Sequence, residues 1–109
     1  MSPAFRKKLS LVSINDFGEL IRSLRYIPDP DDFEEMRAPW IVFEQHGGDC
    51  DDVAILSAIW AHLKGYRWRW LLWGQDNLIY HISTEIKDIA HIDPFGSKRY
   101  KLQYCGKWN

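Results

Sequence analysis

Residues 50–64 are apolar on nearly every face of a helical wheel, and this feature constrains the fold more than any other. Asp49 is a suitable N-cap for a helix that begins here, and Gly65 suits the position just after its end. A helix that is apolar on all sides must be buried within the protein. The sequence therefore predicts a fold built around one central helix, from about Cys50 to Lys64.

One face of this predicted helix carries only small side chains, which recur at helical spacing. We call it the small-residue face, and its members are Cys50, Ala54, Ser57 and Ala61. Small side chains allow another element to approach the helix backbone closely. This face is therefore a place where a β-hairpin can pack.

Beyond the central helix, apolar residues alternate with a period of two, which is typical of β-strands. The predicted strands span residues 66–73, 78–86, 89–93 and 100–104, with turns at 74–77 and 87–88. Before the central helix, the sequence predicts a helix at about 15–25, a short helical turn at 31–36 and an apolar stretch at 40–43. Helices followed by an antiparallel meander of strands indicate the α+β class.

Length and charge exclude several classes of protein. A chain of 109 residues fits one domain, here 1–109. With 14 basic and 15 acidic residues, the net charge of -1 argues against a protein that binds nucleic acid by bulk electrostatics. No run reaches the roughly 18 apolar residues of a membrane span, and no signal peptide is recognisable. We therefore expect no membrane partner, a location in a reducing cytoplasm, and no cofactor.

Cys50, His81 and Asp93 are the candidate catalytic residues. Cys50 lies at the predicted start of the central helix, where the partial positive charge of the helix dipole favours a thiolate. A three-residue loop at 86–88 would set His81 directly opposite Asp93 in a hairpin, with both side chains on one face. If that hairpin packs on the small-residue face, His81 can reach Cys50.

A Cys–His–Asp arrangement performs nucleophilic catalysis on a carbonyl group. The imidazole takes the thiol proton or pairs with the thiolate, the carboxylate orients the imidazole, and the thiolate forms a thioester that water or an amine resolves. Three neighbouring aspartates oppose ionisation of the thiol: Asp49, Asp51 and Asp52. Asp52 is expected to turn away and support the fold through hydrogen bonds. The backbone N–H of Cys50 and the side chain of Gln45 are candidate oxyanion donors.

The same residues lie in a pattern that resembles the active site of transglutaminase-like proteins. Their helix motif, G-x-C-x-D-x-A-x-L, matches Gly48 to Leu56, and the helix ends at Gly65. Tyr80 to Glu85 resembles their histidine strand, and Ile92-Asp93-Pro94 resembles their closing Asp-Pro. The resemblance covers about residues 45–95.

Within that family, the G-D-C-D-D form is most similar to small members encoded by tailed phages and prophages. The resemblance implies a papain-like fold and a cysteine hydrolase or acyltransferase that acts on an amide through Cys50, His81 and Asp93. The implied partners are a peptide or protein acyl donor and phage structural proteins. The implied location is the bacterial host cytoplasm or the virion. The chain departs from many relatives at Ser83, where they have an aromatic residue, and its His–Asp spacing is shorter.

Other interpretations of the same residues stay open. A short chain leaves little room for a substrate subdomain, so the fold can instead serve as a non-catalytic binding module in phage or prophage assembly. A buried cysteine is often only a small apolar side chain. His46 and the neighbouring aspartates resemble metal ligands, but Asp51 and Asp52 diverge on a helix and cannot share a face. Three further residues outside any motif are expected to be structural, exposed or inert: His62, His91 and Cys105.

Overall fold

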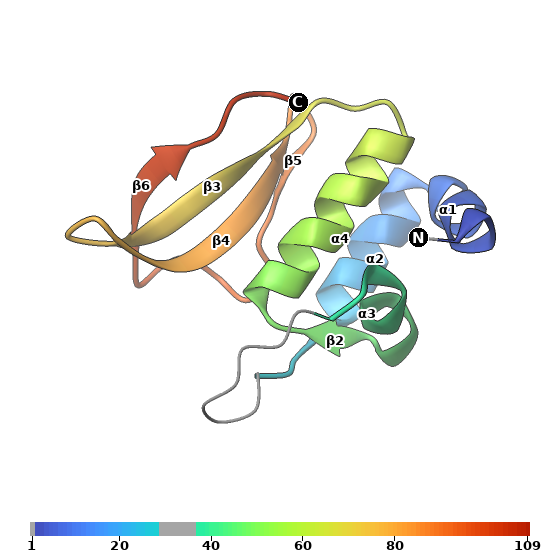
Figure 1. Cartoon of the computed structure of the whole chain (residues 1–109), viewed down its shortest axis with the longest axis horizontal. Coiled ribbons are helices and arrows are strands. Elements are labelled where there is room, and N and C mark those ends of the chain that lie inside the picture. The colour runs from blue at the N-terminus through green and yellow to red at the C-terminus, as the bar shows by residue number, and fades with distance from the viewer. Residues whose placement is uncertain (1, 29–36) are drawn as a thin grey trace.

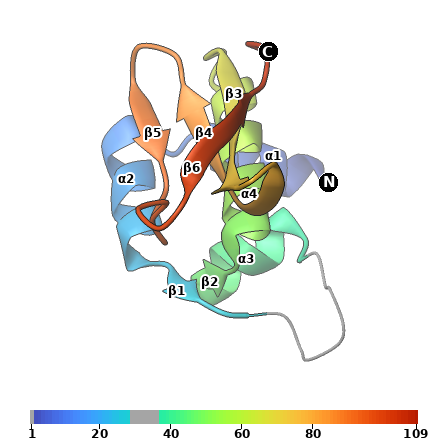
Figure 2. The same cartoon turned by 90° about the vertical axis from the view of Figure 1, so that its left-hand side faces the viewer.

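The structure is a computed structural model that describes residues 2–28 and 37–109. Within these residues the helices are α1 (Pro3–Ser10), α2 (Ile14–Ser23), α3 (Pro39–Gln45) and α4 (Cys50–Leu63). The strands are β1 (Arg25–Tyr26), β2 (Gly47–Gly48), β3 (Trp68–Gln75), β4 (Leu78–Ile86), β5 (Ala90–Ile92) and β6 (Lys101–Cys105). The helices gather on one side and the twisted antiparallel sheet on the other (Figures 1 and 2). The predicted α+β class is confirmed.

Helix α4 begins at Cys50 because a capping box closes its N-terminus. Asp49 Oδ1 accepts a hydrogen bond from the backbone N–H of Asp52 at 3.1 Å, and Asp52 Oδ2 accepts one from the backbone N–H of Asp49 at 3.0 Å. Gly65 follows the helix with φ of +79°, a conformation that glycine adopts without steric cost. The predicted central helix is therefore confirmed, together with its N-cap and terminal glycine.

The small-residue face of α4 is buried, with Ala54, Ser57 and Ala61 each at most 2% exposed. Thr84 Oγ1 of β4 donates a hydrogen bond to the carbonyl of Ala54 at 2.9 Å, and Trp70 Nε1 of β3 donates to the same carbonyl at 3.5 Å. Two strands therefore approach the backbone of α4 closely, as the small side chains predict.

The other side of α4 is less enclosed than the sequence predicts. Ile55, Ile59 and Leu63 are only half-buried, and His62 is exposed. These side chains line a shallow, largely apolar groove together with Arg6, Ala58, Trp68 and Trp70. The prediction of a helix buried on all sides is wrong for this stripe, because among the described residues no further element covers it.

The sheet has the strand order β5-β4-β3-β6. Asp76 and Asn77, with φ of 54° and 65°, form the two-residue turn that joins β3 to β4. β6 pairs with β3 instead of following β5, so the predicted meander is wrong for the last strand. A physical reason is that β5 has only three residues before Pro94, whereas β3 offers a longer edge for pairing.

Two short helices are absent from the sequence-based prediction. α1 follows Ser2, whose hydroxyl accepts a hydrogen bond from the backbone N–H of Phe5 at 3.2 Å, and it begins with Pro3. α3 also begins with a proline, Pro39. It covers residues 40–43, for which the sequence indicates an apolar stretch but no helix. The helical turn predicted at 31–36 lies outside the described residues.

The hydrophobic core lies between α4, the N-terminal helices and the sheet. Phe17 of α2 stacks on Trp60 of α4 with ring centroids 4.3 Å apart, and Trp60 Nε1 donates to the carbonyl of Val12 at 3.0 Å. α2 confirms the helix predicted at about 15–25. The other buried members of this cluster are Leu9, Ile21, Leu24, Val42, Val53, Leu56, Ala61 and Ile86.

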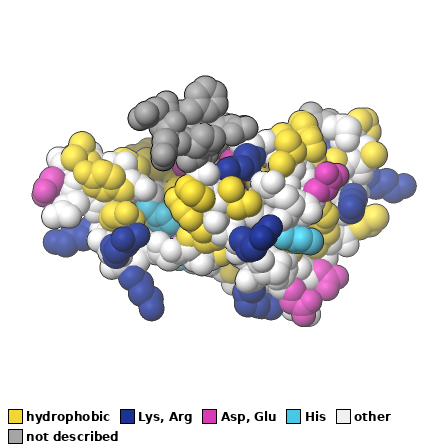
Figure 3. All heavy atoms as spheres, turned by 90° about the horizontal axis from the view of Figure 1, so that it is seen from below, with side chains coloured by type: hydrophobic (Ala, Val, Ile, Leu, Met, Phe, Trp, Pro, Cys, Tyr) yellow, Lys and Arg dark blue, Asp and Glu magenta, His cyan; other side chains and the backbone are white. Residues whose placement is uncertain are grey.

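The surface carries charges of both signs. In the view of Figure 3, basic and acidic side chains lie among hydrophobic ones, and the basic residues form no continuous stripe on the described part of that face. None of the helices in the described part of the chain is long and apolar enough to cross a membrane.

Candidate active site

Cys50 is the first residue of α4, and it is half-buried and not in a disulfide. The chain leading into it is held by the parallel pairing of β1 with β2, in which Tyr26 lies beside Gly48. The backbone N–H of Cys50 has no hydrogen-bond partner among the described residues, as is usual for the first turn of a helix. An unpaired N–H at this position can donate to an oxyanion that forms beside the sulfur.

His81 of β4 and Asp93, the residue after β5, are joined by a short hydrogen bond. His81 Nε2 lies 2.6 Å from Asp93 Oδ1, and the two side chains are only 6% and 9% exposed. Because Nε2 bonds to the carboxylate, Nδ1 is the ring nitrogen that is left for Cys50. The predicted pairing of this histidine with this aspartate is present in the structure.

The strand register that produces this pairing differs from the predicted one. The predicted loop at 86–88 would set Glu85 opposite Ile89, but Glu85 lies opposite His91, so β5 is displaced by two residues along β4. A displacement of two keeps every side chain on its predicted face. His81 and Asp93 therefore still share a face, but they meet diagonally instead of directly.

Cys50, His81 and Asp93 line the same small hollow, which has almost no room for a water molecule. The rest of its lining is mainly apolar: Val53, Ala54, Ile82, Ile92, Pro94 and Phe95. Helix α4 supplies the cysteine, β4 supplies the histidine, and the end of β5 supplies the aspartate. Three residues that are far apart in the sequence are thus brought together at one place.

The surroundings of His81 favour its protonated form. Hydrogen bonding to Asp93 and then to Cys50 raises the pKa of His81 to about 9, although burial acts in the opposite direction. Burial raises the pKa of Asp93, but hydrogen bonds from His81 and Ser97 outweigh it and hold this pKa below its ordinary value. At neutral pH the pair is therefore an imidazolium and a carboxylate, which places a cation at the hollow that Cys50 also lines.

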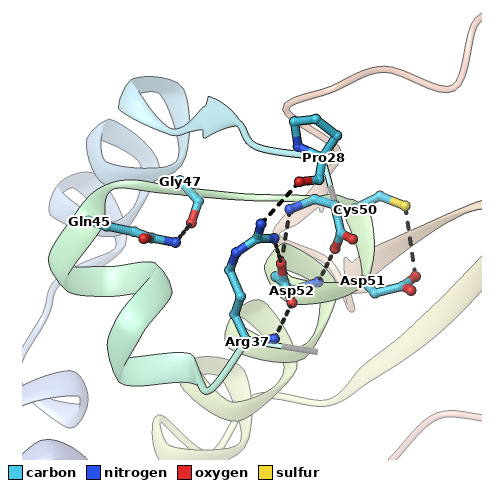
Figure 4. A network of polar contacts seen from close by, with 8 residues as sticks. Pro28, Arg37, Gln45, Gly47, Cys50, Asp51 and Asp52 are labelled. Carbon is cyan, nitrogen blue, oxygen red and sulfur yellow. Dashed lines mark hydrogen bonds and ion pairs between the residues drawn. The ribbon is translucent and has the colours of Figure 1, made fainter. Parts of the chain in front are cut away.

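The side chain of Asp52 and the sulfur of Cys50 point to different sides of the helix start (Figure 4). The Asp52 side chain is fully buried and accepts hydrogen bonds from the backbone N–H of Arg37 at 2.9 Å and from the guanidinium of Arg37 at 2.8 Å. Asp51 is the aspartate whose carboxylate lies near the sulfur, with Oδ1 3.8 Å from Cys50 Sγ. Asp52 thus turns away from the thiol and serves the fold, as the sequence predicts.

Gln45 closes α3 and does not face the sulfur. Its side-chain Nε2 donates to the carbonyl of Gly47 at 3.0 Å, and Figure 4 shows it well apart from Cys50 Sγ. In this conformation the backbone N–H of Cys50 is the better-placed oxyanion donor.

Three residues that sequence reasoning did not assign to the site surround the acid and the base. The ring of Tyr100 stacks on His81 with centroids 6.1 Å apart and an interplanar angle of 21°. Ser97 helps to lower the pKa of Asp93, and His91 Nε2 lies 3.9 Å from Asp93 Oδ2. The short Asp93–Tyr100 spacing is the sequence signal that could have indicated a loop folding back over the histidine.

Within the described part of the chain, no group of three or more His, Cys, Asp or Glu side chains is arranged to hold a metal ion. His46, considered above as a ligand, instead ends α3 in a left-handed conformation with φ of 52°. No family model, curated protein or solved structure matches the chain. The chemistry of the site is therefore interpreted from its own geometry.

Proposed function

We propose that the protein is a transglutaminase-like cysteine hydrolase or acyltransferase with a papain-like fold, acting on an amide such as a peptide bond or a glutamine side chain. One observation carries the proposal: Cys50, His81 and Asp93 meet at one hollow, with the cysteine at a helix N-terminus. The similarity of the sequence motifs to small phage and prophage proteins supports the same assignment.

In the proposed mechanism, the Cys50 thiolate attacks the amide carbonyl carbon, and a new C–S bond forms. The negative charge moves to the carbonyl oxygen, where the backbone N–H of Cys50 donates a hydrogen bond. The His81 imidazolium gives its proton to the leaving nitrogen as the C–N bond breaks, which leaves a thioester. Neutral His81 then accepts a proton from water or an amine, whose attack releases the acyl group and restores the thiolate.

The charge state of His81 defines its part in this mechanism. A histidine with a pKa of about 9 already carries the proton at neutral pH. It therefore acts first as the cationic partner of the thiolate and as a general acid, and it becomes a base only after the leaving group has taken the proton. Asp93 holds the imidazole in place and stabilises its positive charge.

The proposal is tested by the alkylation rates of the two cysteines at pH 6–7, measured by mass spectrometry with iodoacetamide. An unactivated thiol is only about 1% ionised there, so Cys50 is expected to react at least about tenfold faster than Cys105. Cys105 is the internal control because it is exposed and lies outside the site. Equal rates, together with no effect of His81→Ala, would disprove an activated thiolate.

A second candidate function is a non-catalytic binding module of a phage or prophage assembly or accessory protein, located in the host cytoplasm or the virion. The size of the hollow favours it, since the hollow has almost no room for a water molecule, whereas typical ligand pockets measure roughly 300–1,000 Å³. Peptidase and amine-transfer assays separate the two functions. Wild-type turnover of a glutamine-containing peptide that is lost in Cys50→Ala supports the enzyme, and equal product from both proteins supports the binding module.

A further inference from the structure

A second imidazole lies beside the acid of the candidate site. His81 Nε2 is 2.6 Å from Oδ1 of Asp93, whereas His91 Nε2 is 3.9 Å from Oδ2. The two imidazoles thus flank the two oxygens of one carboxylate. His81 is almost fully buried, while the side chain of His91 is 36% exposed.

His91 is held in this position by two residues of the neighbouring strands. Its Nε2 lies 2.6 Å from the hydroxyl of Ser83, and Trp73 Nε1 donates to that same hydroxyl at 2.9 Å. The indole ring of Trp73 also stacks on His91 with centroids 5.8 Å apart. The hydroxyl oxygen has two acceptor positions, so it can accept from Trp73 Nε1–H and also from an Nε2–H of His91.

Asp93 needs such support because of where it lies. β5 ends at Ile92, so the backbone of Asp93 is already outside the ladder of strand hydrogen bonds. A carboxylate at the end of a strand can turn about its side-chain torsions unless neighbours fix both oxygens. His81 hydrogen-bonds to Oδ1 of this carboxylate, and His91 lies on the side of Oδ2.

We propose that His91 is a positioning residue of the Cys–His–Asp site: anchored by Trp73 and Ser83, it limits rotation of the Asp93 carboxylate and keeps Oδ1 on His81. The inference rests on the proposed function, since this positioning matters for catalysis only if the His81–Asp93 pair serves Cys50. It also gives Ser83 a role. An aromatic side chain at that position, as in many transglutaminase-like proteins, would offer no hydroxyl close to the strand backbone to hold His91.

The test is an NMR titration of the His81 imidazole in the full-length protein, with the resonance assigned by its loss in His81→Gln. Wild-type His81 is expected to titrate near pH 9. In Ser83→Ala and in His91→Asn the carboxylate is freer, so the midpoint is expected to fall by about half a unit or more. Ser83→Thr keeps the hydroxyl and should restore the wild-type midpoint.

The matched control is His62→Asn, which removes an exposed imidazole of α4 outside this cluster and should leave the His81 midpoint unchanged. An unchanged midpoint in His91→Asn overturns the proposal. A raised midpoint also overturns it, because His91 would then act only as a competing positive charge. If Ser83→Ala fails to fold, His91→Asn alone decides the test. The side chain of His91 is partly exposed, so its replacement should leave the protein folded.

This titration needs no turnover, so it separates the two proposals. A lowered His81 midpoint together with a slow Cys50 alkylation rate supports the positioning and overturns the catalytic function. A fast Cys50 alkylation rate with an unchanged midpoint supports the function and overturns the positioning.

Discussion

His81 and Asp93 bond across a diagonal of the β4–β5 hairpin, with Nε2 and Oδ1 2.6 Å apart although the backbone ladder does not set them opposite one another. The same diagonal joins Ser83 to His91 at 2.6 Å. Diagonal neighbours on one face are about 7–8 Å apart at the backbone, which a histidine ring and a short polar side chain can span together. The acid and the base are thus fixed by one short hairpin, and Cys50 reaches them only through the packing of α4 on β4.

The first prediction concerns the pH dependence of stability. The pKa of His81 is raised from 6.5 to about 9 in the folded protein, so its protonated form stabilises the fold. This contribution is fully present below about pH 6.5 and is lost as the pH rises through about 9; it amounts to at most roughly 3 kcal/mol. Urea unfolding between pH 6 and pH 9.5 should show the loss.

Asp93→Asn is the matched variant for that measurement, because it removes the main cause of the raised pKa and keeps the shape of the side chain. Its stability should be lower at pH 6 and should depend less on pH up to pH 9.5. If the unfolding free energies of the wild type and Asp93→Asn changed with pH in the same way, the ion pair would not be the cause of the pH dependence.

The second prediction concerns the buried carboxylate of Asp52. It accepts hydrogen bonds from the backbone of Asp49 and from both the backbone and the guanidinium of Arg37. Asp52→Asn would turn an amide donor toward these donors and remove the charge opposite Arg37, at a cost of about 2–4 kcal/mol in unfolding free energy. Asp51→Asn, one residue earlier and half-exposed, should cost less than about 1 kcal/mol. Equal losses in the two variants would contradict the structural role assigned to Asp52.

The sequence predicts the central helix well because several local signals agree there. Asp49 caps the helix, Gly65 follows it, and the residues between them are apolar. The pairing of His81 with Asp93 is also predictable, because successive side chains of a strand alternate between the two faces of the sheet. The actual register is displaced by two residues, which changes the opposed pairs without changing the faces.

Other features depend on contacts that no local pattern records. β6 pairs with β3 because of the edge that β3 offers, and this is a property of the assembled sheet. The role of His91 needs Trp73 and Ser83 from two other strand positions, so no spacing motif could indicate it. Ser2 and Pro3 form a recognisable helix start, but α1 has only eight residues and buries only Leu9, so its apolar pattern is too short to predict a helix.

The third prediction concerns Ser57, on the small-residue face of α4. Its hydroxyl is fully buried and has no hydrogen-bond partner among the described residues. Ser57→Ala removes this unpaired group and favours the helix slightly, so it should leave stability unchanged or raise it by up to about 1 kcal/mol. Thr84→Val is the contrasting variant, since it deletes a buried hydroxyl that bonds to Ala54, and should cost about 1–2 kcal/mol. A clear loss of stability in Ser57→Ala, seen by chemical denaturation, would mean that the hydroxyl has a partner in solution.

The fourth prediction links the β3–β4 hairpin to the site. Gly74 lies where the register of β3 shifts, and a Cβ added there would sit 1.6 Å from the carbonyl oxygen of Leu78. Gly74→Ala must therefore push the two backbones apart beside Trp73, which lies opposite His81. We expect a loss of at least about 2 kcal/mol in unfolding free energy and a lower midpoint for the titration of His81 by NMR.

The control variant is Gly18→Ala in α2, where an added Cβ would face only the flexible side chain of Arg22. It should stabilise the protein by about 0.5–1 kcal/mol without changing the titration midpoint of His81. A stability of Gly74→Ala equal to that of the wild type would contradict this prediction. It would mean that the two strands are farther apart in solution at the shifted register, and that the position of His81 does not depend on their close approach.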